Sequence, residues 1–189
     1  WAVLSIAPTG GSPTIQGTAF CGNLFEPCTN GPQDSAKALL LQGDGKIVMA
    51  GTGTESGNRN VYLARVDSGG TLDNGFSGDG RLTFPIGTGT DVARGLALDS
   101  DGRAVITGTT TTSDDEDFFV ARIDDADGEL DTAFGSGDGI VTTEFENDAD
   151  EESYDLLVMP DGRIVAGGFT TYGTDHDFAL ARYNMDGSP

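Results

Sequence analysis

Basic residues, histidine and cysteine are scarce in this 189-residue sequence, and their scarcity narrows what the protein can bind. The 10 lysines and arginines stand against 31 aspartates and glutamates, which gives a net charge of −21. Nucleic acid and anionic lipid headgroups would be repelled by that charge, so we expect neither as a partner. No apolar run approaches the ~20 residues that span a bilayer, so membrane insertion is not expected either.

The two cysteines, Cys21 and Cys28, lie only seven positions apart. They cannot form a tetrahedral metal site by themselves, because such a site needs four ligands and the single histidine, His176, is distant in sequence. A disulfide that closes a short loop is the favoured interpretation and indicates a secreted protein, with two free thiols as the alternative. Because the sequence begins at Trp1 rather than methionine, we expect a mature or trimmed product.

Helical periodicity is missing as well, whereas glycine is abundant, with 29 residues. This composition favours many short strands joined by tight turns. One string built on an Asp-Gly pair occurs three times, at intervals of 57 and then 60 residues, which predicts a repeat architecture. Each pair predicts a hairpin with a primed turn, because glycine accepts the positive φ that such a turn needs. The three pairs are Asp44-Gly45, Asp101-Gly102 and Asp161-Gly162.

Each full repeat is predicted to contain four short strands: one before the Asp-Gly turn, one after it, one ending in Ala-Arg, and one after a Gly-Asp-Gly turn. The predicted strands are 36–42, 46–50, 62–66 and 81–84, then 92–99, 103–107, 118–123 and 140–145, then 154–159, 163–166 and 178–183. Four antiparallel strands of this length form one blade of a β-propeller. The predicted fold is therefore all-β and propeller-like, with about three blades, the last lacking its fourth strand.

Three blocks recur in the same order over about residues 34–189 and resemble the delta-60 repeat. They read Ala-Leu-x-x-Asp-Gly-Lys/Arg-Ile-Val-x-Ala-Gly, then Asp-Phe-x-Leu-Ala-Arg, then Asp-Gly-x-Leu-Asp-x-x-Phe-Gly. The delta-60 repeat is a bacterial and archaeal repeat assigned to β-propeller-type domains of large exported proteins. The resemblance implies an extracellular or cell-surface location, and it implies no catalytic residues.

The repeats divide a single domain into four parts. Residues 1–33 hold diverged third and fourth strands of a repeat and the cystine loop, and the repeats occupy 34–90, 91–150 and, incompletely, 151–189. A closed propeller typically has four to eight blades, so this count has three explanations. The chain is a fragment of a larger propeller, or its own N-terminal strand closes the third blade, or a neighbouring copy completes the open edge.

Two sets of residues are candidates for a site. A run of carboxylates around one turn is the candidate for weak calcium binding, and no other cofactor is predicted. Its spacing does not fit the twelve-residue calcium loop, and the favoured alternative is that these aspartates bond to their own backbone in turns. The run comprises Asp124, Asp125, Asp127 and Asp131.

The second set is an arginine that ends an apolar strand once in each repeat: Arg65, Arg122 and Arg182. An anion site is one interpretation. A structural ion pair with a turn aspartate, such as Asp73 or Asp131, is favoured, because a buried arginine requires such a partner and can bond to it bidentately. The threonine-rich stretch 107–113 and the acidic stretches 114–117 and 144–155 are predicted to be exposed loops.

Together these patterns predict a non-enzymatic, extracellular structural or adhesive module. We expect it to self-associate or to join a larger exported assembly, such as a filament or a surface layer. The alternative is a propeller that binds a glycan or calcium. An enzyme such as a glycosidase or a lyase is a distant third, because no G-x-S-x-G occurs and no pair of carboxylates stands out for acid–base work.

Overall fold

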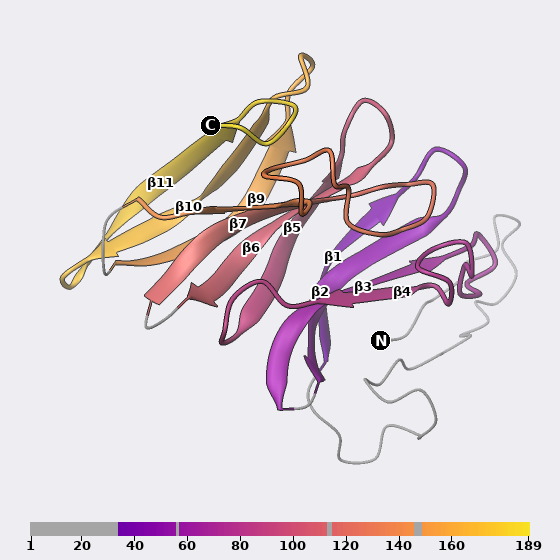
Figure 1. Ribbon diagram of the computed structural model, residues 1–189, viewed down its shortest axis with the longest axis horizontal. Coiled ribbons are helices and arrows are strands. Elements are labelled where there is room, and N and C mark those ends of the chain that lie inside the picture. Colours follow the sequence, from indigo (N-terminus) through magenta and orange to yellow (C-terminus); the bar gives the residue numbers. More distant parts are fainter. Residues whose placement is uncertain (1–33, 56, 113–114, 146–148) are drawn as a thin grey trace, which may run out of the picture.

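The computed structural model describes residues 34–55, 57–112, 115–145 and 149–189, which form three antiparallel sheets (Figure 1). No helix occurs in this part of the chain. Residues 1–33, with both cysteines and the predicted N-terminal strands, lie outside the described residues. The disulfide between Cys21 and Cys28 therefore stays a prediction.

Each sheet consists of strands that follow one another along the chain. The first sheet has the order β1 (Ser35–Leu41), β2 (Ile47–Glu55), β3 (Asn58–Val66), β4 (Arg81–Phe84). The second has the order β5 (Asp91–Leu98), β6 (Ala104–Thr112), β7 (Asp115–Ile123), β8 (Ile140–Thr143). The third contains β9 (Asp150–Val158), β10 (Ile164–Tyr172) and β11 (Asp175–Tyr183), with β10 in the middle. This arrangement confirms the predicted propeller-like fold and, among the described residues, the three-stranded last blade.

The sheets pack face to face in chain order (Figure 1). The first strand of each sheet lies against the sheet before it: β5 contacts β1, β2 and β3, and β9 contacts β5, β6 and β7. Because side chains alternate between the two faces of a strand, the second sheet buries both of its faces. In β7, Phe119 and Ala121 belong to the core shared with the first sheet, whereas Phe118 and Val120 belong to the core shared with the third.

The Asp-Gly hairpins form where they were predicted, but the type of turn is different. Gln42 accepts a hydrogen bond from the N–H of Gly45 at 3.0 Å, and its own N–H donates to the carbonyl of Lys46 at 2.8 Å. Only the glycine has a positive φ, +88° at Gly45. This pattern is a type I turn followed by a left-handed glycine, so the prediction of a primed two-residue turn is wrong. Gly102 and Gly162 take the same conformation, at +85° and +82°.

Substitutions at two glycines of this first turn separate backbone strain from crowding. Gly45→Ala is expected to lower the free energy of unfolding by about 1–2 kcal/mol, because an L-residue pays that cost in the left-handed region. The added methyl group meets only Ser68, at an ordinary 3.7 Å. Gly43→Ala is the matched control, since Gly43 has open space and no positive φ. Urea denaturation measures both, and an equal loss in the two variants would contradict the strain argument.

The central hairpins are longer than predicted, and they bury residues that were expected in exposed loops. β6 continues through the threonine-rich stretch and pairs with β7 as far as Thr112 and Asp115. Thr107, Thr109 and Thr110 are buried, so the prediction of an exposed loop is wrong there. The reason is that β-branched residues fit a pleated sheet and extend the ladder.

The acidic stretches are only partly in loops. Residues 150–155 lie in β9, and the side chain of Glu151 is fully buried, with a hydrogen bond from Thr170 Oγ1 at 3.3 Å. Asp117 is also buried, in β7, where Thr112 donates to it. The prediction of solvated loops is wrong for these two carboxyl groups, because strand alternation turns them inward.

Candidate functional site

The repeated arginines lie near the ends of β3, β7 and β11, and the first two are buried side chains that form ion pairs. Arg65 is only 3% exposed. Its Nε donates to Asp73 Oδ2 at 2.8 Å, and its Nη1 donates to Asp125 Oδ1 at 2.8 Å. The guanidinium also lies over the ring of Phe76, 4.9 Å from the centroid. Asp73 belongs to the same repeat and Asp125 to the next, so Arg65 joins two blades.

Arg122 repeats this arrangement one blade further on. Its Nε donates to Asp131 Oδ2 at 2.7 Å, and its Nη1 donates to the carbonyl of Met185 at 2.5 Å. The guanidinium lies over the ring of Phe134, 4.7 Å from the centroid. Both arginines therefore confirm the predicted structural ion pair with a turn aspartate. In each case a second bond crosses to the turn that follows the third strand of the next blade.

The turn aspartates Asp73 and Asp131 have lowered pKa values. Burial alone would raise the pKa of Asp131, but the backbone N–H of Ala133 and the charges of Arg122 and Arg103 hold it below its ordinary value of 3.8. Burial opposes the same result at Asp73, where the N–H of Gly75 and the charges of Lys46 and Arg65 lower the pKa. Both carboxylates are thus fully ionised at neutral pH, as a structural pair requires.

Arg182 does not repeat the arrangement. Its side chain is exposed and makes no salt bridge with any residue that the structure describes. In the first two blades the turn aspartate follows the arginine in the chain, as Asp73 follows Arg65. No described residue is the equivalent of this aspartate for Arg182. The third arginine therefore lies at an incomplete copy of the site.

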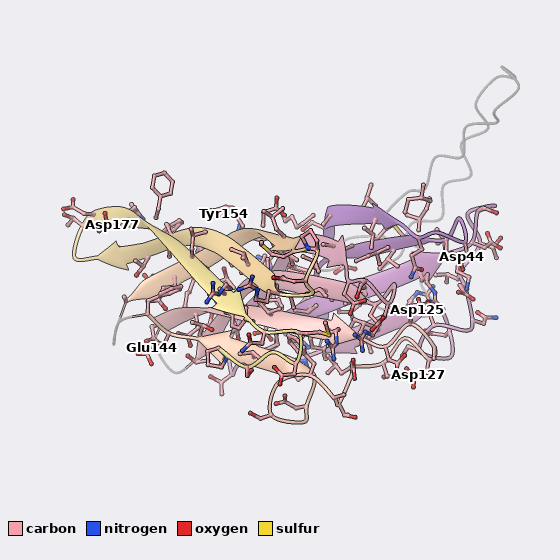
Figure 2. The ribbon with its side chains drawn as sticks, turned by 90° about the horizontal axis from the view of Figure 1, so that it is seen from above. Asp44, Asp125, Asp127, Glu144, Tyr154 and Asp177 are labelled. Atoms are coloured by element: carbon pink, nitrogen blue, oxygen red, sulfur yellow. The ribbon has the colours of Figure 1, made fainter. Side chains whose placement is uncertain are left out.

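The face of the third sheet around Arg182 is apolar and exposed. Phe178 is 102% exposed, Leu180 71% and Leu157 67%. Tyr154, on the same sheet, is half exposed, and Figure 2 labels it between Asp44 at one end of the molecule and Asp177 at the other. The equivalents of Phe178 and Leu180 in the second sheet, Phe118 and Val120, are completely buried. Identical repeat positions thus have opposite environments, which marks this face as the candidate functional site.

The candidate calcium residues have other partners. Asp124 Oδ1 accepts from the N–H of Ala126 at 2.9 Å, and Asp127 Oδ1 accepts from the N–H of Glu129 at 3.0 Å. These are the turn bonds of the alternative interpretation. Asp125 and Asp131 instead receive the arginines described above. Within the described ranges, no three or more His, Cys, Asp or Glu side chains are arranged to hold a metal ion.

A charged cluster that the sequence did not indicate joins the second and third sheets. Arg94 on β5 forms an ion pair with Glu152 on β9, and its guanidinium lies 4.8 Å from the ring centroid of Tyr154. Burial raises the pKa of the nearby Glu116, and the charges of Glu152 and Asp150 raise it further. The cluster was missed because it does not recur: the equivalent of Glu152 in the second repeat is a valine.

Sequence reasoning also missed the aromatic rings under the arginines and the role of Asp125 as a bridge between blades. The rings had a visible signal, because Phe76 and Phe134 each follow a pairing aspartate by three positions. Asp125 had none, since Ser68 occupies its position in the first repeat. His176, the lone histidine, contacts Thr171 Oγ1 at 3.2 Å and lies edge-on to the ring of Phe169.

Comparison with known proteins agrees with the repeat. No curated protein matches the sequence. In the parts of the chain that the structure describes, no helix is both long and apolar enough to cross a membrane. Three segments, residues 42–76, 100–134 and 160–189, match the beta-propeller domain of unknown function DUF5122, and together they make up more than half of the sequence. Each segment begins near an Asp-Gly turn and includes the arginine strand, so the chain belongs to the DUF5122 beta-propeller family.

Proposed function

We propose that this chain is a non-enzymatic structural or adhesive module of the delta-60 type, located outside the cell or on its surface, which joins a larger assembly. The observation that carries the proposal is the free edge of β11. Residues 61–64 of β3 pair with β4, and residues 118–121 of β7 pair with β8. The equivalent residues 178–181 of β11 pair with no fourth strand among the described residues.

Backbone groups at the arginine position show what the free edge lacks. The N–H of Arg65 donates to the carbonyl of Gly80 at 2.9 Å, and the N–H of Arg122 donates to the carbonyl of Gly139 at 3.0 Å. Among the described residues, no equivalent carbonyl accepts a hydrogen bond from the N–H of Arg182. An edge with unused donors and acceptors recruits an extended segment, so strand addition is the mode of assembly that this edge supports.

The chemistry of the remaining polar residues supports a structural role. Arg65 and Arg122 bond to their turn aspartates and to turns of the next blade, as described above, which leaves these groups engaged in holding the blades. The net charge of −21 favours solubility and repels other acidic surfaces, which suits a protein exposed to solvent and salt. These features support a scaffold more than a catalyst.

A peptide test addresses the edge directly. A synthetic peptide spanning residues 137–145, which contain Gly139 and the strand β8, is added to the purified chain. We expect it to bind and to slow amide exchange of Phe178, Leu180 and Arg182 by about tenfold or more, because alternate N–H groups of β11 face the open edge and backbone pairing protects them. A peptide with the same residues in shuffled order is the control.

Two results would count against the assembly role. One is equal protection by both peptides, which would mean that the edge does not select a strand. The other is the absence of any protection at saturating peptide, which would mean that β11 has no open edge in solution.

A further inference from the structure

A cluster of charged side chains lies between the second and third sheets, near the β6–β7 hairpin. We call it the junction cluster and define it by Arg94 on β5, Glu116 on β7, and Asp150 and Glu152 on β9. Arg94 pairs with Glu152, and the two side chains are 26% and 23% exposed. The charges of Asp150 and Glu152 both act on Glu116 across the junction. Three carboxylates therefore share one guanidinium, which leaves two negative charges in excess.

Strand alternation turns Glu116 toward the third sheet. It lies on the same face of β7 as Phe118 and Val120, which belong to the core that the second sheet shares with the third. At this junction β9 packs against β5, β6 and β7 (Figure 1). The cross-strand neighbour of Glu116 on β6 is the uncharged Thr111. Among the described residues, the charges that face Glu116 therefore come from β5 and β9.

Three further carboxyl groups lie near the cluster and have partners of their own. Asp115 and Asp117 point to the opposite face of β7, where both accept hydrogen bonds from Thr112 Oγ1. On β9, Glu151 accepts from Thr170 Oγ1 at 3.3 Å. Of the three carboxyl groups of β7, one is therefore turned toward the third sheet.

The four positions of the junction cluster have equivalents between the first and second sheets. The register of the strands and of their bulges gives the correspondence. The equivalents of Arg94, Glu116, Asp150 and Glu152 are Lys37, Arg59, Thr90 and Val92, in that order. That junction thus has two cations and no carboxylate at these positions, and it also packs an apolar core. The excess of negative charge is therefore not required by the repeat and is particular to the second junction.

Burial and like charges act in the same direction on Glu116. Burial raises its pKa above the ordinary 4.5, the charges of Glu152 and Asp150 raise it further, and Arg94 only partly offsets them. The junction therefore favours the protonated form of this carboxyl group. Tyr154 does not compete for the proton, because burial and the charge of Glu152 raise the pKa of its hydroxyl above 10.0.

We propose that the junction cluster is an acid-sensitive contact, in which uptake of a proton by Glu116 strengthens the docking of the third sheet on the second. The proton removes one of three negative charges and leaves the pair of Arg94 and Glu152 intact. The inference is independent of the free edge of β11, because the cluster lies between the second and third sheets.

The direction of the pH dependence follows from the folded and unfolded states. The pKa of Glu116 is ordinary, near 4.5, in the unfolded chain and is raised in the folded protein. The stability gained from protonation is therefore fully present below pH 4.5 and is lost as the pH rises through the folded pKa. The turn pairs behave in the opposite way, because the pKa values of Asp73 and Asp131 are lowered below 3.8. The two effects thus act in separate pH ranges.

Glu116→Gln tests the proposal, because glutamine has the shape of the protonated carboxyl group and carries no charge. Glu144→Gln is the matched control, since Glu144 is exposed and lies outside the cluster. We expect Glu116→Gln to have a higher urea midpoint than the wild type at neutral pH and the same midpoint at about pH 4. The control variant is expected to follow the wild type throughout. Comparing the chains at one pH removes the contribution of groups that titrate alike in both.

Hydrogen exchange assigns the effect to the junction. β10 is the middle strand of the third sheet, so its N–H groups exchange when that sheet opens. We expect Glu116→Gln to slow their exchange by about threefold or more at neutral pH and to leave it unchanged at about pH 4. Exchange in β2, in the first sheet, is expected to stay the same and is the internal control.

An NMR titration of the side-chain carboxyl carbons tests the charges that act on Glu116. We expect Glu116 to titrate at a higher pH than Glu144. Asp150→Asn removes one repelling charge from an exposed position, so this variant is expected to fold and to lower the titration midpoint of Glu116. The midpoint of Glu144 is expected to stay where it is.

Three results would overturn the proposal. One is a Glu116→Gln variant that is no more stable than the wild type at neutral pH, or whose advantage persists at about pH 4. Another is slower exchange in β2 as well as β10, which would mean that the effect is not a property of this junction. The third is a titration midpoint of Glu116 that Asp150→Asn does not change. None of these measurements involves the strand peptide, so failure here is distinguishable from failure of the proposed function.

Discussion

Replacing Phe118 with alanine is expected to lower the free energy of unfolding by about 3–5 kcal/mol, the range for a fully buried phenylalanine. Phe118 is 0% exposed and belongs to the core between the second and third sheets. Its ring also contacts Phe145 edge-on, with centroids 5.0 Å apart. The substitution removes apolar surface and leaves a cavity between two sheets that cannot easily move together, because hydrogen-bonded ladders hold each one.

Phe178→Ala is the matched control, because Phe178 occupies the same position in the next repeat and is 102% exposed. We expect this variant to change stability by less than about 0.5 kcal/mol, as exposed substitutions usually do. Both are measured by urea denaturation at a protein concentration low enough to keep the chain monomeric, since association would add stability of its own. Similar losses in the two variants would contradict the different environments of the two rings.

This pair also shows the limit of reading burial from the sequence. The strings around Phe118 and Phe178 are nearly the same, Phe-Phe-Val-Ala-Arg and Phe-Ala-Leu-Ala-Arg. Local pattern therefore predicts the same strand and the same alternation for both, and both predictions are confirmed. Burial depends on whether another sheet follows, which is a property of the number of blades and not of the string. That is why the candidate site emerged only from the packed structure.

Other parts of the fold were predictable because one short-range rule decided them. The Asp-Gly pairs fixed the first hairpin of each repeat, and the arginine–aspartate pairs followed from the cost of burying an unpaired charge. The type of turn could not be predicted from the Asp-Gly pair. It is decided by the hydrogen bond from the N–H of Gln42 to the carbonyl of Lys46, and both of these residues lie outside the pair. The length of β6 could not be predicted either, because threonine occurs in both loops and strands. Pairing with β7 is what extends β6 as far as Thr112.

Asp131→Ala is expected to lower the free energy of unfolding by about 3–5 kcal/mol, because it leaves the guanidinium of Arg122 buried without its counter-charge. Asp131 is 7% exposed and Arg122 is 3% exposed, and the two bond at 2.7 Å. Asp161→Ala is the control, because its partner Arg163 and the carboxylate itself are exposed and such pairs contribute little. A loss no larger than that of the control would show that the carbonyl of Met185 and the ring of Phe134 suffice to hold Arg122.

The same variant has a defined pH dependence. The pKa of Asp131 is lowered in the folded protein below its ordinary 3.8, so its stabilising effect is present at pH values above 3.8 and is lost as the pH falls through the folded pKa. The difference in stability between wild type and Asp131→Ala should therefore be constant near neutral pH and should shrink below about pH 4. Urea denaturation across the acid range measures it. A difference that grows on acidification would mean that the carboxylate is not the stabilising form, and the ion pair would then not be what holds Arg122 between the blades.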